Sequence, residues 1–278
     1  MNVLKKIGNF FVAMVPFWIY FGVQVLAGFV LGIVFMVQAV ASGENAPDLT
    51  SASILMTTSI VSQVAAFIGG VITMLASKTK MRDMSPVQQD KKVYGITIIF
   101  TMGAFFVLQL INSLMLSVFG VTEMDSTQAL LSESVPFMFF TALFAPFVEE
   151  LIFRGLLVTF FKKRGFSDWF TITAITITFA LIHSQNMMVY ALVFGLVLMG
   201  IRYVTGDWKL CVVFHFVGNL MSCLLSVLAP SEEAASSVII IGSIVGGIIA
   251  IITAIFGVKS AIANINSESE MPNPEISC

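Results

Sequence analysis

Two glutamates and an arginine lie close together in the segment APFVEELIFRGLL, which is otherwise apolar. Glu150 and Arg154 are four residues apart, so on a helix they would share one face and could form an ion pair. Glu149 would lie about 100° around the helix from Glu150 and would be available for acid–base chemistry. An ion pair that holds helices together would explain Glu150 and Arg154, but it would give the carboxylate of Glu149 no role.

The chain has two histidines, and both lie in apolar sequence. His183 ends FALIH, and His215 is followed one helical turn later by Asn219. A lone histidine on an apolar face usually only packs, but two of them with an isolated glutamate favour a site. Burial suits Glu149 as a general base, and His183 could orient a water or pass a proton to a leaving amine. Asn219 and His215 could donate hydrogen bonds to an oxyanion.

The elements that must position these side chains are predicted to be membrane-spanning helices. Of the 278 residues, 58% are hydrophobic and 11% are charged, against about 25% charged residues in soluble domains. The apolar runs are too long for barrel strands, and lipid leaves backbone polar groups without partners outside helices. We therefore expect an all-α polytopic bundle of about eight transmembrane helices, at 9–41, 51–77, 93–118, 135–161, 170–183, 187–204, 210–228 and 236–258.

These spans divide one integral domain into consecutive regions. Residues 1–134 hold three N-terminal membrane helices, and 135–228 hold the helices with the candidate site residues. The last membrane helix falls in 229–259, and a disordered polar tail is expected over 260–278. Gly242 and Gly246 are spaced for close helix packing, which we expect inside the bundle rather than in a dimer.

Charge distribution predicts the orientation. With eight crossings, Lys and Arg gather on one side, and the charged residues of the opposite loops are all acidic. Both termini are therefore predicted to be cytoplasmic. Counted from the cytoplasmic helix ends at about 1.5 Å per residue, Glu149, His183, Asn219 and His215 lie about 18, 20, 15 and 9 Å deep. We therefore expect an acid, two imidazoles and an amide from separate helices to converge around a water.

Three motifs resemble those of the CAAX protease and bacteriocin-processing family of intramembrane peptidases. They read Glu149-Glu150-x-x-x-Arg154, Phe179-x-x-x-His183 and His215-x-x-x-Asn219, in the family's order and over about residues 135–228. The resemblance implies an eight-helix bundle with a cytoplasm-facing cavity. It also implies that Glu149 and His183 activate water while His215 and Asn219 stabilise the oxyanion.

Family members include enzymes that trim prenylated proteins, and bacterial relatives are associated with peptide maturation and bacteriocin self-immunity. The expected partners are accordingly a peptide or a lipidated membrane protein as substrate, together with the lipid bilayer. The resemblance and the short loops suggest a bacterial plasma membrane. Nucleic acid is not expected, because the net charge is -2 and no large basic patch is present.

Three alternatives remain open. A zinc ion could be held by Glu149, His183 and His215 with an open fourth position, although HExxH is absent and Asn219 would then have no role. We favour the version without a cofactor. A proton-coupled transporter also places Glu and His at mid-depth, and a non-catalytic immunity or scaffold protein could keep the same motifs.

Overall fold

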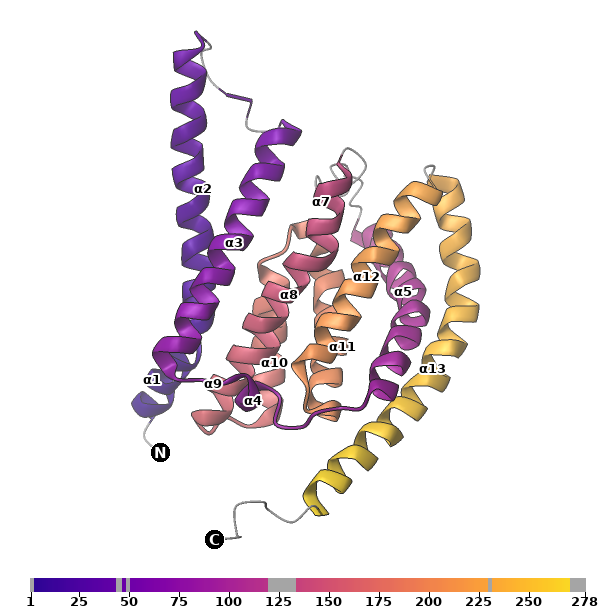
Figure 1. The fold of residues 1–278 in the computed structure, drawn as a ribbon. Helices are drawn as coiled ribbons and strands as arrows, with labels where there is room; N and C mark the ends of the chain where they lie inside the picture. Colours follow the sequence, from indigo (N-terminus) through magenta and orange to yellow (C-terminus); the bar gives the residue numbers. More distant parts are fainter. Residues whose placement is uncertain (1–2, 44–46, 49–50, 120–133, 230–231, 271–278) are drawn as a thin grey trace. The chain divides into compact units, whose positions relative to one another are not determined.

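The structure, a computed structural model, describes residues 3–43, 47–48, 51–119, 134–229 and 232–270, and within these ranges it contains helices and no strand (Figure 1). The described residues include seven helices long and apolar enough to cross a membrane: Val15–Ala41, Ala52–Ser77, Lys91–Val118, Val135–Lys163, Gln185–Thr205, Trp208–Leu228 and Glu233–Ser267. The predicted all-α polytopic class is confirmed.

The fifth predicted span, 170–183, is shorter than the others. It corresponds to helix α10 (Asp168–Leu181), which has 14 residues. At about 1.5 Å per residue it is about 21 Å long, less than the ~30 Å hydrocarbon core of a bilayer. Within the described residues, seven long helices and this short one correspond to the eight spans expected from the sequence.

The chain separates into two compact units, which are described one at a time. The first comprises Met1–Lys80 and Glu123–Thr178, and the second Met81–Thr122 and Phe179–Cys278, so the unit boundary falls within α10.

The first unit packs its N-terminal helices against the segment that carries the two glutamates. Helix α1 (Val3–Ala13) is followed by α2 (Val15–Ala41), whose first turn contains Pro16, and α2 packs on α3 (Ala52–Ser77). Proline has no N–H to donate, which suits the first turn of a new helix. A Cβ on Gly70 would lie 2.8 Å from Ile152 Cδ1, so α3 approaches the glutamate segment closely.

That segment is a continuous but irregular helix. In order it consists of α7 (Val135–Phe139), the π-helical turn η1 (Phe140–Phe144), α8 (Ala145–Glu150), a second π-helical stretch η2 (Leu151–Leu157) and α9 (Val158–Lys163). The first π turn ends two residues before Pro146, and this proline removes one backbone donor from the helical hydrogen bonds. Such π-bulges are frequent at functional sites, and these two flank the Glu149–Glu150 pair.

The second unit contains α4 (Met81–Met84), α5 (Lys91–Phe119), α11 (Gln185–Thr205), α12 (Trp208–Leu228) and α13 (Glu232–Glu270). Helices α5 and α13 make its most extensive contact (Figure 1). A Cβ on Gly246 would lie 2.6 Å from the backbone oxygen of Gly103, and one on Gly242 would lie 2.5 Å from the Phe106 ring. The expectation that these glycines pack the last helix within the bundle is confirmed.

The last helix extends further than the sequence indicated. Helix α13 continues to Glu270, whereas a disordered tail was expected from residue 260; residues 271–278 lie outside the described residues. Ala261 is fully buried, and the Asn264 amide lies 3.0 Å from Gln89 Oε1. This part of the chain therefore has a packed alanine and a hydrogen-bonded asparagine in the second unit, which the composition alone did not reveal.

Asp207 connects the ends of several helices in the second unit. Its carboxylate is fully buried and accepts hydrogen bonds from Ser85 Oγ at 2.6 Å, from the Tyr94 hydroxyl at 2.7 Å and from the Lys209 N–H at 3.0 Å. Asp207 thereby caps α12 and ties the α11–α12 turn to α5.

Candidate active site

The ion pair predicted within the glutamate motif is present. Arg154 Nη1 donates to Glu150 Oε1 at 3.0 Å, and neither side chain is exposed. Breaking such a pair would leave an uncompensated charge in the interior, so the two residues depend on each other. The pair connects the last residue of α8 to η2 inside the first unit.

Glu149 has a different environment from its neighbour. It is only partly buried, and Gln63 on α3 donates from Nε2 to Glu149 Oε1 at 3.3 Å. Of the two adjacent carboxylates, one is therefore enclosed in an ion pair and the other is accessible. This separation is what a general base at this position requires.

His183 lies in the short connection between α10 and α11 rather than inside a helix. Its Nδ1 is 2.7 Å from the backbone oxygen of Phe179, one turn earlier. A carbonyl oxygen can only accept, so Nδ1 carries the hydrogen, and in the neutral ring Nε2 presents its lone pair. The FxxxH spacing thus fixes the tautomer in which Nε2 can accept a proton.

Both imidazoles pack against Phe179. The ring centroid of Phe179 is 4.6 Å from that of His183 and 6.3 Å from that of His215 on α12. His215 is 6% exposed and also makes an edge contact with Phe194, 4.9 Å between centroids. Asn219 follows one turn later on α12 and is partly exposed. The second unit therefore brings His183 and His215 to the same aromatic side chain, with Asn219 on the face of His215.

Glu149 belongs to the first unit, whereas His183, His215 and Asn219 belong to the second. The convergence of the acid with the imidazoles and the amide stays a prediction. The zinc alternative stays one as well, because its ligands Glu149, His183 and His215 come from both units. Among the described residues no group of three His, Cys, Asp or Glu side chains is gathered as metal ligands.

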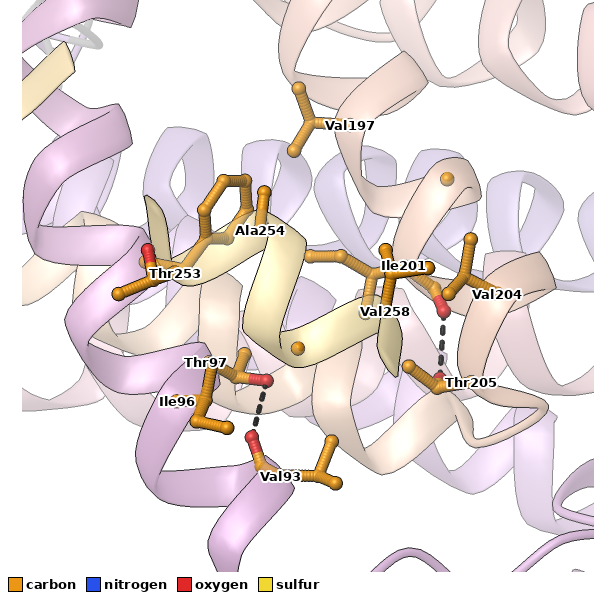
Figure 2. Close-up of a pocket in the computed structure, with 13 residues that line it drawn as sticks. Val93, Ile96, Thr97, Val197, Ile201, Val204, Thr205, Thr253, Ala254 and Val258 are labelled. Carbon is orange, nitrogen blue, oxygen red and sulfur yellow. Dashed lines mark hydrogen bonds between the residues drawn. The ribbon is translucent and has the colours of Figure 1, made fainter. Parts of the chain in front are cut away.

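A separate apolar cavity of about 210 Å³ lies between α5, α11 and α13 in the second unit (Figure 2). The hydroxyls of Thr97, Thr205 and Thr253 in its wall donate to backbone oxygens one turn earlier, at 2.9, 2.7 and 2.6 Å. Phe100 in the same wall contacts Phe214, 5.6 Å between centroids. The cavity presents hydrocarbon and contains none of the predicted site residues, so it offers room for an apolar group but no acid–base chemistry.

Sequence reasoning missed the polar residues that surround Glu149 on other helices. Gln63 contacts its carboxylate directly, and the buried Tyr20 lies beside Gln63 and Gln24 on the same side of the first unit. These side chains are neutral, so the charged residues of the predicted spans did not point to them. The signal that could have found them is a glutamine within an apolar span, which is costly at membrane depth without a partner.

Comparison with known proteins supports the family resemblance. Residues 131–221 match the family model described as type II CAAX prenyl endopeptidase Rce1-like. All three motifs fall inside this stretch, and the match confirms the family resemblance found in the sequence. No curated protein matches the chain significantly, and no solved structure does so.

Proposed function

We propose that this multi-pass membrane protein is an intramembrane endopeptidase that hydrolyses a peptide bond near the cytoplasmic face. The observation that carries the proposal is the match of residues 131–221 to an Rce1-like prenyl endopeptidase family. That stretch contains one accessible carboxylate next to a neutralised one, and a histidine whose hydrogen bond leaves Nε2 as an acceptor.

In the proposed reaction Glu149 removes a proton from a water molecule as the water oxygen attacks the scissile carbonyl carbon. His183 Nε2 accepts a hydrogen bond from the second O–H of that water and orients it. The proton taken by Glu149 is then delivered, directly or through His183, to the leaving nitrogen as the C–N bond breaks. The products are a carboxylic acid and an amine.

His215 and Asn219 are proposed to stabilise the negative charge that develops on the carbonyl oxygen. Both can donate, and both lie on one face of α12. His215 is nearly buried between Phe179 and Phe194. A donor held in an environment of low dielectric is worth more to an oxyanion than one in water, and it needs little reorganisation.

The proposed substrate class is based on the family resemblance and on the predicted orientation. We propose a peptide or a lipidated membrane protein that is presented at the cytoplasmic face, with both termini of the enzyme on that side, in a bacterial plasma membrane. Processing of a peptide or bacteriocin, or self-immunity, is compatible with the same chemistry.

The test uses purified full-length protein in detergent and a prenylated CAAX peptide as the probe. Glu149→Gln should lower cleavage at least about 10²-fold, the smaller end of what a general base contributes. Glu233→Gln is the matched control, because Glu233 is an exposed carboxylate near the start of α13; it should keep wild-type activity.

Equal activity of the two variants would contradict the role of Glu149. If the protein does not cleave the prenylated peptide but drives ion-coupled uptake in vesicles, it is a transporter. If the Glu149→Gln variant protects cells from a bacteriocin as well as the wild type does, the protein is a scaffold or immunity protein.

Whether cleavage needs zinc can be tested by measuring the rate after metal removal. The proposal uses only protein groups, since Asn219 is a poor zinc ligand and an apt oxyanion donor. Exhaustive dialysis against a zinc chelator should therefore leave the rate unchanged. Loss of activity that zinc restores would instead favour the site formed by Glu149, His183 and His215.

A further inference from the structure

Three neutral polar residues of the first unit form a cluster that reaches Glu149 through Gln63, although they lie outside the stretch that matches the family model. Tyr20 and Gln24 come from α2, Gln63 comes from α3, and the match covers residues 131–221. Tyr20 is 3% exposed. Polar side chains in such apolar helices are costly to bury, so a cluster of them indicates a shared partner.

The contacts within this cluster lead to the carboxylate. Gln63 Nε2 donates to Glu149 Oε1 at 3.3 Å. The Tyr20 hydroxyl lies beside the amides of Gln24 and Gln63 and within the electrostatic reach of Glu149. Gln63 is therefore the link between Tyr20 and Glu149.

Two atoms of the cluster have no protein partner. Gln24 Nε2 and Gln63 Oε1 are both buried, and neither makes a hydrogen bond in the part of the chain that the structure describes. A buried donor or acceptor left unpaired is destabilising. A donor, an acceptor and a carboxylate in one place are the set of groups that an ordered water bridges.

We propose that Tyr20, Gln24 and Gln63 are positioning residues that hold the Glu149 carboxylate, and an ordered water beside it, in the orientation needed for proton abstraction. The inference rests on the proposed function and deepens it. Gln63 fixes one carboxylate oxygen, and Tyr20 lies beside both Gln63 and Gln24. The N-terminal helices thus complete a site whose motifs all lie further along the chain.

A staple between helices would explain the same hydrogen bond without any role in the reaction. The two explanations differ in what removal of the Gln63 amide does. A purely structural hydrogen bond would contribute to stability whether or not residue 149 takes part in the reaction. A positioning residue affects turnover only while Glu149 is there to be positioned.

The experiment compares Gln63→Met, which keeps the unbranched shape, with Gln38→Met as the matched control. Gln38 is an exposed glutamine near the other end of α2. A hydrogen bond to a charged group corresponds to about a 10- to 100-fold effect on rate. Gln63→Met should lower kcat by that factor and leave KM unchanged, and Gln38→Met should change neither.

Two further measurements keep the test decisive. In the Glu149→Gln background, Gln63→Met should cause no additional loss of the residual rate. Tyr20→Phe removes a single hydroxyl, so it tests the cluster if Gln63→Met fails to fold, and it should lower kcat several-fold.

The failures can be told apart. A wild-type protein no more active than Glu149→Gln would end the proposed function. An active wild type with an inactive Glu149→Gln, but with Gln63→Met and Tyr20→Phe at wild-type kcat, would overturn only the positioning role. A loss from Gln63→Met that is undiminished in the Glu149→Gln background would also overturn it.

Discussion

Removal of Arg154 alone should destabilise the protein far more than removal of the whole ion pair. Arg154 and Glu150 are both fully buried and 3.0 Å apart. In Arg154→Leu the carboxylate of Glu150 stays in the interior without its guanidinium. In the double variant Glu150→Leu/Arg154→Leu both charges are replaced by side chains that suit the surrounding core.

The magnitude follows from the burial. Breaking a buried pair by removing one partner costs about 3–5 kcal/mol, whereas replacing both with apolar residues is often close to neutral. A charge at membrane depth carries a similar penalty, about 2.5–3.5 kcal/mol on insertion scales. We therefore expect Arg154→Leu to lower the free energy of unfolding by about 4 kcal/mol and the double variant by less than about 2 kcal/mol.

The assay is equilibrium unfolding of the purified protein in mixed micelles, followed by circular dichroism. Lys162→Leu/Asp168→Leu is the control, because this pair is 4.0 Å apart with side chains 49% and 62% exposed; it should change stability by less than about 1 kcal/mol. If Arg154→Leu cost no more than the control, or if the double variant were as unstable as the single one, the reasoning from burial would be refuted.

Further predictions concern the helix contacts and the oxyanion donors. Gly246→Ala should destabilise the α5–α13 contact because its Cβ would meet backbone atoms, whereas Gly95→Ala, with open space around it, should be neutral or slightly stabilising in the same unfolding assay. Asp207→Ala should cost about 2–4 kcal/mol because three partly buried donors lose their fully buried acceptor; exposed Asp168→Ala should cost less than about 1 kcal/mol. Asn219→Ala should lower kcat about 10²-fold with little change in KM, and an effect confined to KM would make Asn219 a substrate contact.

Much of the fold could be predicted because lipid restricts the chain to long apolar helices, and these are visible in the sequence. The boundaries of α3 and α12 lie within two residues of those expected. The π-helical stretches on either side of α8 could not be predicted, since no residue spacing in the sequence distinguishes them from the α-helix between them. The extension of α13 depends on partners such as Gln89, which lies far away in the sequence.

In the candidate site, too, some contacts could be predicted from the sequence and others could not. Spacing of four residues was enough to predict the ion pair between Glu150 and Arg154, because helix geometry alone brings them together. Spacing did not reveal that Phe179 accepts a hydrogen bond from His183 or that its ring touches both imidazoles. Gln63 was missed because its role depends on the packing of α3 against α8, which no local pattern encodes.

The central claim is that Glu149 and His183 act on one water, and a double-mutant cycle on cleavage tests it most directly. Single-turnover rates would be measured for the wild type, Glu149→Gln, His183→Ala and the double variant with the same prenylated peptide. Groups that act as a unit are strongly non-additive, so we predict that the double variant is no slower than the slower single variant. Losses that multiply would mean that the two residues act independently, which would contradict the account.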